Sequence, residues 1–123
     1  KTKWIDEALK WAEECARRSP QQVPYNEVVG RALWQRAALE TTVKQLEYYD
    51  RAIAVYKRCA ELYPVKPFVW RDYGRRCLEY GTRRVEAGDV KGGQPLVDEG
   101  NRALKHADEL QAQWDRIEAQ RSQ

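Results

Sequence analysis

The amino-acid sequence predicts an all-α fold of antiparallel helical hairpins, with about five helices. Apolar residues recur at helical spacing along nearly the whole chain, and strict alternation of apolar and polar residues is nowhere sustained. A second observation is a residue pattern that returns after 44 positions. The 123 residues include five Trp and seven Tyr, enough large apolar groups to exclude disorder. We therefore predict a single domain covering residues 1–123.

Prolines and glycines delimit the expected helices. The first helix is expected from about Thr2 to Ser19, before Pro20, and Pro24 can open the second because its fixed φ suits a first turn. The side of the first helix that is expected to be buried contains Trp4, Ile5, Ala8, Leu9, Ala12, Cys15 and Ala16.

A further helix is predicted from Pro67, with Gly88 as its C-terminal stop. Its expected buried stripe consists of Phe68, Trp70, Tyr73, Gly74, Cys77, Leu78 and Val85. The segment GDVKGGQP, residues 88–95, is predicted to be a turn. The last helix is then expected from about Pro95 to near Ala119, with a seam formed by Leu96, Gly100, Ala103, Ala107, Leu110, Trp114 and Ile117.

The 44-residue spacing relates ALKWAEECARRSP, which starts at Ala8, to AIAVYKRCAELYP, which starts at Ala52. The same shift places Gly30 on Gly74, where two helices of a hairpin would approach closely. Repeats of 20 to 50 residues with two helices each are typical of α-solenoids. Chance matches within an ordinary helical bundle are the alternative.

The repeat also bears on the segment from Tyr25 to Tyr63, where propensity alone allows one long helix. Projecting the glycine-rich turn back by 44 residues predicts a hairpin turn near Lys44 to Tyr48. The chain then reads as the second helix of one unit followed by two full hairpins. Such a start in the middle of a unit suggests a segment of a longer array.

Two stretches resemble the tetratricopeptide repeat (TPR) family. YYDRAIAVYKRCAELYP is similar to the second helix of such a repeat, and PFVWRDYGRRCLEYG is similar to the first, with Trp70, Tyr73 and Gly74 in the positions of the family's Trp, Leu and Gly. The spacing of 44 residues exceeds the usual 34 of this family. Longer-repeat relatives in RNA-processing scaffolds are therefore an alternative. The resemblance implies a short TPR-like solenoid with lengthened helices.

In this family, a concave groove lined by the first helices binds peptides. The resemblance implies that this groove is lined by Glu27, Arg31, Trp34, Gln35, Arg71, Arg75, Leu78 and Glu79. The arginines could hold a peptide carboxylate, since a guanidinium offers a planar fork of donors. The alternative is that they pair with Glu27, Asp72 and Glu79 on a solvated surface. Trp34 is expected either in the core or as an exposed peptide anchor.

Catalytic and metal-binding patterns are not found in the sequence. His106 is the only histidine, and GDVKGG lacks the Lys-Ser/Thr ending of a phosphate-binding loop. The three cysteines, Cys15, Cys59 and Cys77, are interpreted as buried thiols, which favours the cytoplasm. No apolar run is long enough to cross a bilayer. We expect neither enzymatic activity nor a cofactor.

The predicted function is a non-enzymatic scaffold that binds a protein or peptide partner through an acidic or extended segment. Nucleic-acid binding is an alternative, because Arg71, Arg75, Arg76, Arg83 and Arg84 accompany Tyr73 and Tyr80. The net charge of only +3 argues against it. Self-assembly, through an open end or the seam of the last helix, is a third possibility.

Overall fold

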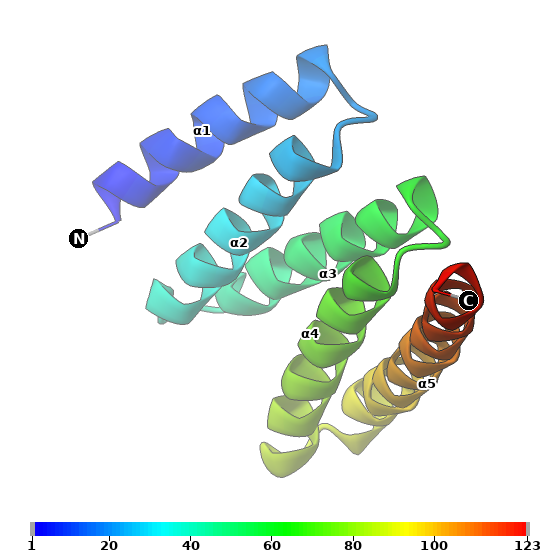
Figure 1. Ribbon diagram of the computed structural model, residues 1–123. Coiled ribbons are helices and arrows are strands. Elements are labelled where there is room, and N and C mark those ends of the chain that lie inside the picture. Colours follow the sequence, from blue (N-terminus) through cyan, green and yellow to red (C-terminus); the bar gives the residue numbers. More distant parts are fainter. Residues whose placement is uncertain (1, 123) are drawn as a thin grey trace. The chain divides into compact units, whose positions relative to one another are not determined.

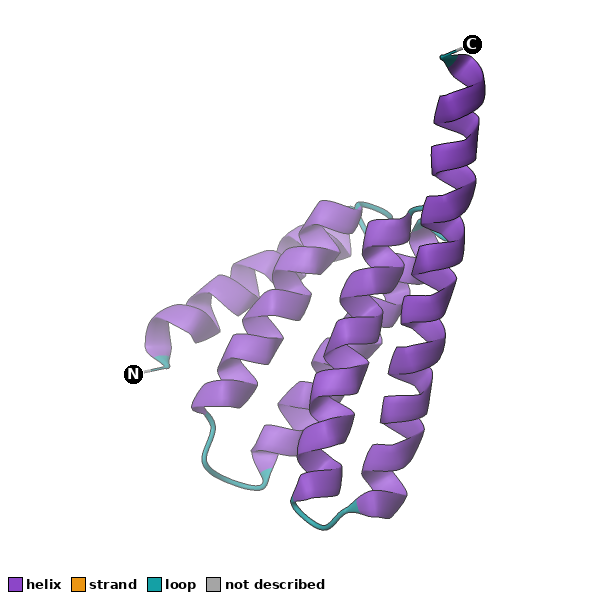
Figure 2. Ribbon diagram, turned by 60° about the horizontal axis from the view of Figure 1, so that its bottom comes forward, coloured by secondary structure: helices purple, strands orange, loops and turns teal. Residues whose placement is uncertain are grey.

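The computed structural model describes residues 2–122, which form helices and short connections and contain no strand (Figures 1 and 2). The five helices of this part of the chain are α1 (Lys3–Arg18), α2 (Val23–Leu39), α3 (Lys44–Leu62), α4 (Pro67–Glu86) and α5 (Val90–Arg121). The predicted all-α class is confirmed. The chain forms two compact units, Lys1–Leu62 and Tyr63–Gln123. Within the described residues, no helix has the length and apolar character needed to cross a membrane.

In the first unit, α2 is the central helix and packs against both α1 and α3. Its residues Leu33 and Ala37 are almost completely buried. Ile5 of α1 and Ala52 and Tyr56 of α3 are buried as well. All three helices therefore contribute residues to the buried part of this unit.

The buried face of α1 is narrower than the sequence predicts. Ile5 and Leu9 are buried, but Trp4, Ala8 and Cys15 are exposed, so their predicted burial is wrong. The reason is that α1 packs only against α2, and one neighbouring helix covers only part of an apolar sector as wide as this one. Cys59 and Cys77 are buried, as predicted.

The break in the segment from Tyr25 to Tyr63 is confirmed, but its predicted position is wrong. The connection comprises residues 40–43, and the predicted turn at Lys44 to Tyr48 is the start of α3. Side-chain hydrogen bonds place the connection here. The carboxylate of Glu40 accepts hydrogen bonds from the backbone N–H groups of Thr41 and Thr42, at 3.0 and 3.1 Å.

Side-chain hydrogen bonds also stabilise the same connection next to the start of α3. The Thr42 hydroxyl oxygen accepts a hydrogen bond from the backbone N–H of Lys44, as a helix cap does. Gln45 Nε2 donates to the carbonyl oxygens of Ala37 and Glu40, both at 3.0 Å. Two carbonyls at the end of α2 therefore receive hydrogen bonds from a side chain of the next helix.

The second unit is the α4–α5 hairpin. Pro67 opens α4, and Gly88 follows its end with a φ of 97°, as the sequence predicts. However, the turn is confined to residues 87–89, so the prediction that residues 88–95 form a turn is wrong. Helix α5 begins at Val90 instead of Pro95, and its cap Asp89 accepts a hydrogen bond from the backbone N–H of Gly92.

Gly93 of that segment lies within α5, at a point where α4 comes very close. A Cβ atom added to Gly93 would lie 2.6 Å from the carbonyl oxygen of Gly81. No side chain fits at that distance, so glycine is needed for helix contact and not for a turn. Pro95 is accommodated within α5.

Two tryptophans hold the segment that precedes α4 within the second unit. Trp70 Nε1 donates to the carbonyl oxygen of Pro64 at 2.9 Å, and Trp114 Nε1 donates to that of Val65 at 3.0 Å. Tyr73 and Cys77 are buried as predicted, whereas the predicted burial of Phe68 is wrong because its side chain is 46% exposed. Along the seam of α5, burial ends at Leu110, and Ile117 is exposed.

Candidate binding surface

The predicted groove residues of α2 occupy three different environments. Arg31 and Gln35 are exposed, and Glu27 is half-buried. Trp34 is only 8% exposed and packs edge-on against Tyr49, with ring centroids 4.8 Å apart. Of the two environments considered for Trp34, the structure shows the core. Trp34 is therefore a core residue and is not exposed to a partner as an anchor.

The predicted groove residues of α4 also differ from one another in exposure and in contacts. Arg75 is exposed, and Arg71 is half-buried. Leu78 is half-buried, and its backbone approaches Gly100 of α5, so part of this residue belongs to the hairpin interface. Glu79 is exposed and forms an ion pair with Arg83 at 3.3 Å.

Within residues 2–122, the three predicted carboxylate-binding arginines, Arg31, Arg71 and Arg75, form no ion pair. Neighbouring arginines on the same two units differ: Arg36 pairs with Asp6 and Glu40, and Arg83 with Glu79. The expected alternative, in which the three cations are neutralised on the surface, is not what the structure contains.

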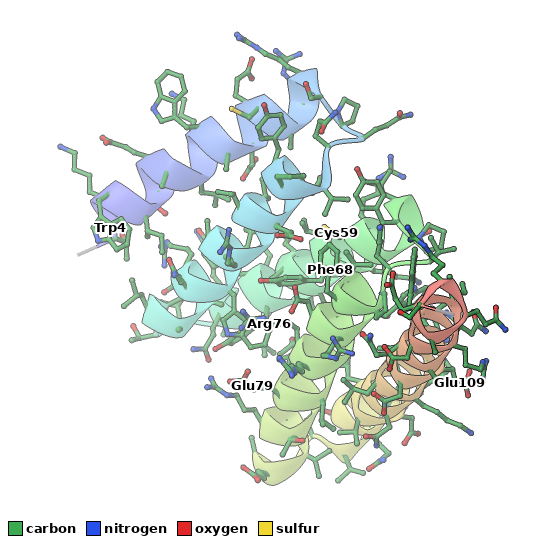
Figure 3. All side chains as sticks on the ribbon, in the orientation of Figure 1. Trp4, Cys59, Phe68, Arg76, Glu79 and Glu109 are labelled. Carbon is green, nitrogen blue, oxygen red and sulfur yellow. The ribbon has the colours of Figure 1, made fainter. Side chains whose placement is uncertain are left out.

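Arg31 and Gln35 line a groove between α1 and α2. Its volume is about 230 Å³, and its lining consists of Trp4, Ile5, Ala8, Val28, Arg31, Ala32 and Gln35. The floor is apolar, because Ile5 and Ala32 are buried and Val28 is partly covered. Figure 3 shows Trp4 near the N-terminal end of α1. The groove thus combines one cation and one amide with apolar walls.

Sequence reasoning missed the contribution of α1 to this groove. Trp4 and Ala8 were expected in the core, and Val28 was not singled out. The available signal was the width of the apolar sector of α1, which runs from Trp4 through Ala16 and is too wide for one neighbouring helix to cover. The excess apolar surface is what forms the groove wall.

Two other depressions border α1, and both are lined mainly by charged residues. One measures about 550 Å³ and includes Asp6, Glu13 and Arg17; the other measures about 470 Å³ and includes Trp11 and Arg18. Glu14 lines both, and hydrogen bonds from Arg17 and Arg18 lower its pKa to about 2. Glu14 is thus bound by two arginines and is not available to a ligand, whereas no ion pair among residues 2–122 involves Glu7 or Lys10, which also line these depressions.

The two tyrosines of the pattern that suggested nucleic-acid binding do not lie on an exposed surface. Tyr73 and Tyr80 are 3% and 1% exposed, so neither presents a ring face on which a base could stack. Tyr73 Oη donates to Glu99 at 2.6 Å, and burial together with this hydrogen bond raises the pKa of Tyr73. Arg84 is bound by Asp89. The aromatic half of the pattern is therefore structural.

The only histidine also has a structural environment. His106 packs edge-on against Trp70, with ring centroids 4.8 Å apart. Across residues 2–122, no group of three or more His, Cys, Asp or Glu side chains is arranged to hold a metal ion.

Comparisons with known proteins leave the site to be interpreted from its own chemistry. No protein-family model matches the chain, and neither curated proteins nor solved structures give a significant match.

Proposed function

We propose that this chain is a non-enzymatic protein-interaction module that binds a partner segment carrying a carboxylate next to an apolar side chain. The groove between α1 and α2 is the proposed binding site. The observation that carries the proposal is Arg31, which is exposed at the rim of an apolar groove and has no ion-pair partner among residues 2–122. A cation in this position is available to an incoming carboxylate.

The chemistry of the groove suits such a segment. The guanidinium of Arg31 can form two parallel hydrogen bonds to a carboxylate, and charge-assisted bonds of this kind are stronger than neutral ones. Gln35 lies one helical turn further along α2 and adds an amide that can bind a peptide backbone. The apolar floor would receive a side chain of the partner, which is removed from water there.

The size of the groove favours a peptide over a small-molecule ligand. Pockets for drug-sized molecules usually measure about 300–1,000 Å³. At about 230 Å³, this groove is smaller and also open, so it fits one or two side chains of a longer segment. The rest of the partner would lie along the helix surface.

Arg71 and Arg75 supply a similar cationic stripe on α4. They are four residues apart and so lie on one helix face. No ion pair engages either side chain within the described part of the chain. We assign them to the same function as a second place where acidic side chains of a partner can bind.

The proposal is tested with Arg31→Glu and a matched control. A panel of fluorescein-labelled acidic peptides, each with Leu, Ile or Phe next to Asp or Glu, is titrated and followed by fluorescence anisotropy. Arg31→Glu should weaken binding at least about tenfold, the size expected for losing a charge-assisted hydrogen bond. Arg58→Glu changes the net charge equally, on an exposed site of α3 outside the groove, and should leave affinity nearly unchanged.

The same experiment can overturn the proposal. Equal weakening by both substitutions would show that only overall charge matters. For the α4 stripe, Arg71→Glu combined with Arg75→Glu should reduce binding while helicity by circular dichroism stays the same. Amide chemical-shift changes on titration should centre on Val28, Arg31 and Gln35; changes centred elsewhere would place the site on another surface.

A further inference from the structure

An exposed apolar stripe runs along α1 beside the side that packs on α2. It consists of Trp4, Ala8, Trp11 and Cys15, all exposed, with Trp4 at 64% and Trp11 at 72%. The steps of four, three and four residues place the four side chains within an arc of about 60°, since each residue turns a helix by about 100°. We call these four residues the α1 stripe. It is the apolar pattern of a helix that packs on another helix.

Small residues at the same spacing are buried elsewhere in the chain. Ala52 and Cys59 of α3 are separated by the same seven residues as Ala8 and Cys15, and they are 0% and 2% exposed in the unit where α3 packs on α2. On α1 the corresponding side chains have no helix over them in the first unit. The α1 stripe therefore has the residue pattern of a helix-packing surface, but no other helix of the first unit covers it.

We propose that the α1 stripe binds the α1 stripe of a second copy of this chain, with the two helices antiparallel. The order of side-chain sizes along the stripe is large, small, large, small. In an antiparallel pair, Trp4 of each copy lies opposite Cys15 of the other, and Trp11 lies opposite Ala8. Every layer then combines one large and one small side chain, which fills the interface evenly.

A parallel pair would pack poorly. It would place tryptophan against tryptophan in two layers and leave gaps at the layers of Ala8 and Cys15, and both overpacking and cavities are destabilising. The antiparallel arrangement is also the one in which the helix dipoles oppose each other.

Charges beside the α1 stripe favour the same orientation. Arg18 Nε donates to Glu14 at 2.8 Å, so the Arg18 guanidinium lies one turn before its own backbone position. In the antiparallel pair, Glu7 of the other copy comes to this level, where it meets two arginines that share the single carboxylate of Glu14. A parallel pair would instead leave Glu7 and Arg18 of the two copies about 16 Å apart along the helix axis, so this contact could not form.

The exposed area indicates a weak, reversible dimer. A tryptophan can bury about 150–250 Å², and about two thirds of each ring of the stripe is exposed, so the two rings offer on the order of 300 Å² per copy. A stable interface usually buries about 800 Å² per partner. We therefore expect weak association, with monomers prevailing in dilute solution and the dimer fraction rising gradually with concentration.

Sedimentation equilibrium of the full chain between roughly 10 μM and 1 mM tests the proposal over the range expected for so small an interface. The average mass should rise from one chain toward two. Trp11→Ala should raise the dissociation constant at least about tenfold, as the loss of a central tryptophan does. Tyr25→Ala removes a partly exposed aromatic ring from α2, outside the stripe, and should leave the constant unchanged. A single-chain mass across the whole range, or equal weakening by both variants, would overturn the proposal.

Trp11 does not line the peptide groove, so this test is separate from that of the proposed function. Because Trp4 and Ala8 belong to both the α1 stripe and the groove, a dimer and a bound peptide compete for them. Trp11→Ala should therefore bind the peptide at least as tightly as the native chain while it loses dimers. The orientation is tested with diamide, which accepts the two electrons and two protons that a pair of thiols loses on forming a disulfide.

Cys15 is the exposed cysteine of the described chain. In the antiparallel pair, the two Cys15 residues are offset by about 16 Å along the helices, too far for a disulfide. The native chain should therefore stay uncrosslinked, and Trp4→Cys should give a covalent dimer through Cys15 of the other copy. A Cys15–Cys15 disulfide in the native chain, or no crosslink in Trp4→Cys, would contradict the antiparallel arrangement.

Discussion

Glycines of α4 and α5 lie where the two helix backbones come closest. A Cβ atom at Gly81 would lie 2.7 Å from the backbone nitrogen of Val97 and 2.8 Å from the carbonyl oxygen of Gly93. Backbone atoms within helices cannot move aside singly, so the helices themselves would have to separate. At Gly30 of the first unit, the nearest atoms belong to the ring of Tyr56, at 3.1 Å. A ring can shift by a few tenths of an ångström.

This difference predicts that the same substitution has unequal effects on stability at the two sites. Gly81→Ala should destabilise the protein by about 1–3 kcal/mol, because overpacking outweighs the roughly 1 kcal/mol that alanine contributes to helix propensity. Gly30→Ala should stay within about 1 kcal/mol of the native chain, since a small shift of the ring offsets the gain in propensity. Urea unfolding followed by circular dichroism measures both. A Gly81→Ala protein as stable as the native chain would show that the close approach is not required.

Helix ends in this protein depend on side chains that bridge consecutive elements. Asp89 is the cap of α5 and also binds Arg84 of α4. Two hydrogen bonds to the Asp89 carboxylate lower its pKa; the one from Arg84 has the larger effect and the one from the Gly92 backbone N–H the smaller. The cap therefore keeps its charge in mildly acidic solution. Between α2 and α3 the bridging side chain is neutral, since the amide of Gln45 serves the end of the preceding helix.

Gln45 tests whether such a bridge fixes the connection. Gln45→Ala removes two donors from the carbonyls of Ala37 and Glu40, and should destabilise the protein by about 1–2 kcal/mol. Gln45→Glu should destabilise it further, because a carboxylate cannot donate and carries a negative charge to a helix C-terminus. Thermal unfolding gives the order of the three proteins. A glutamate variant more stable than the alanine variant would contradict the role of Gln45 as a donor.

The sequence predicts helices well here and their ends less well. Apolar periodicity and proline positions were sufficient for α1 and for the start of α4. The α2–α3 connection depends on hydrogen bonds of Glu40, Thr42 and Gln45, which a projected spacing cannot contain. The glycines of GDVKGGQP resemble a turn locally, and only the position of α4 reveals that they make room for a neighbouring helix.

The sequence also predicted only part of the candidate site, because the rest depends on how the helices pack against one another. Arg31 and Gln35 were placed on an exposed stripe because helical spacing determines which residues share a face. The other wall of the groove could not be predicted, since it depends on how much of the apolar sector of α1 is covered by α2. Trp34 shows the reverse case: its spacing fits the stripe, but Tyr49 of α3 buries it.

At the scale of the whole chain, each compact unit has its own buried core. Val23 of α2 and Val69 of α4 are a matched pair, each 2% exposed near the proline that opens its helix. Because the helices of each unit pack against one another, a cavity in one core should act first on the amides of that unit.

Replacing either valine by alanine removes buried methyl groups and should cost about 1–3 kcal/mol locally. Hydrogen exchange read by NMR distinguishes the units. Val23→Ala should accelerate exchange of the slow amides of α2 and α3 about tenfold, while those of α4 and α5 keep their native rates, and Val69→Ala should do the opposite. If either substitution accelerated exchange equally along the whole chain, the two cores would be one cooperative structure, and the division into two units would have no energetic meaning.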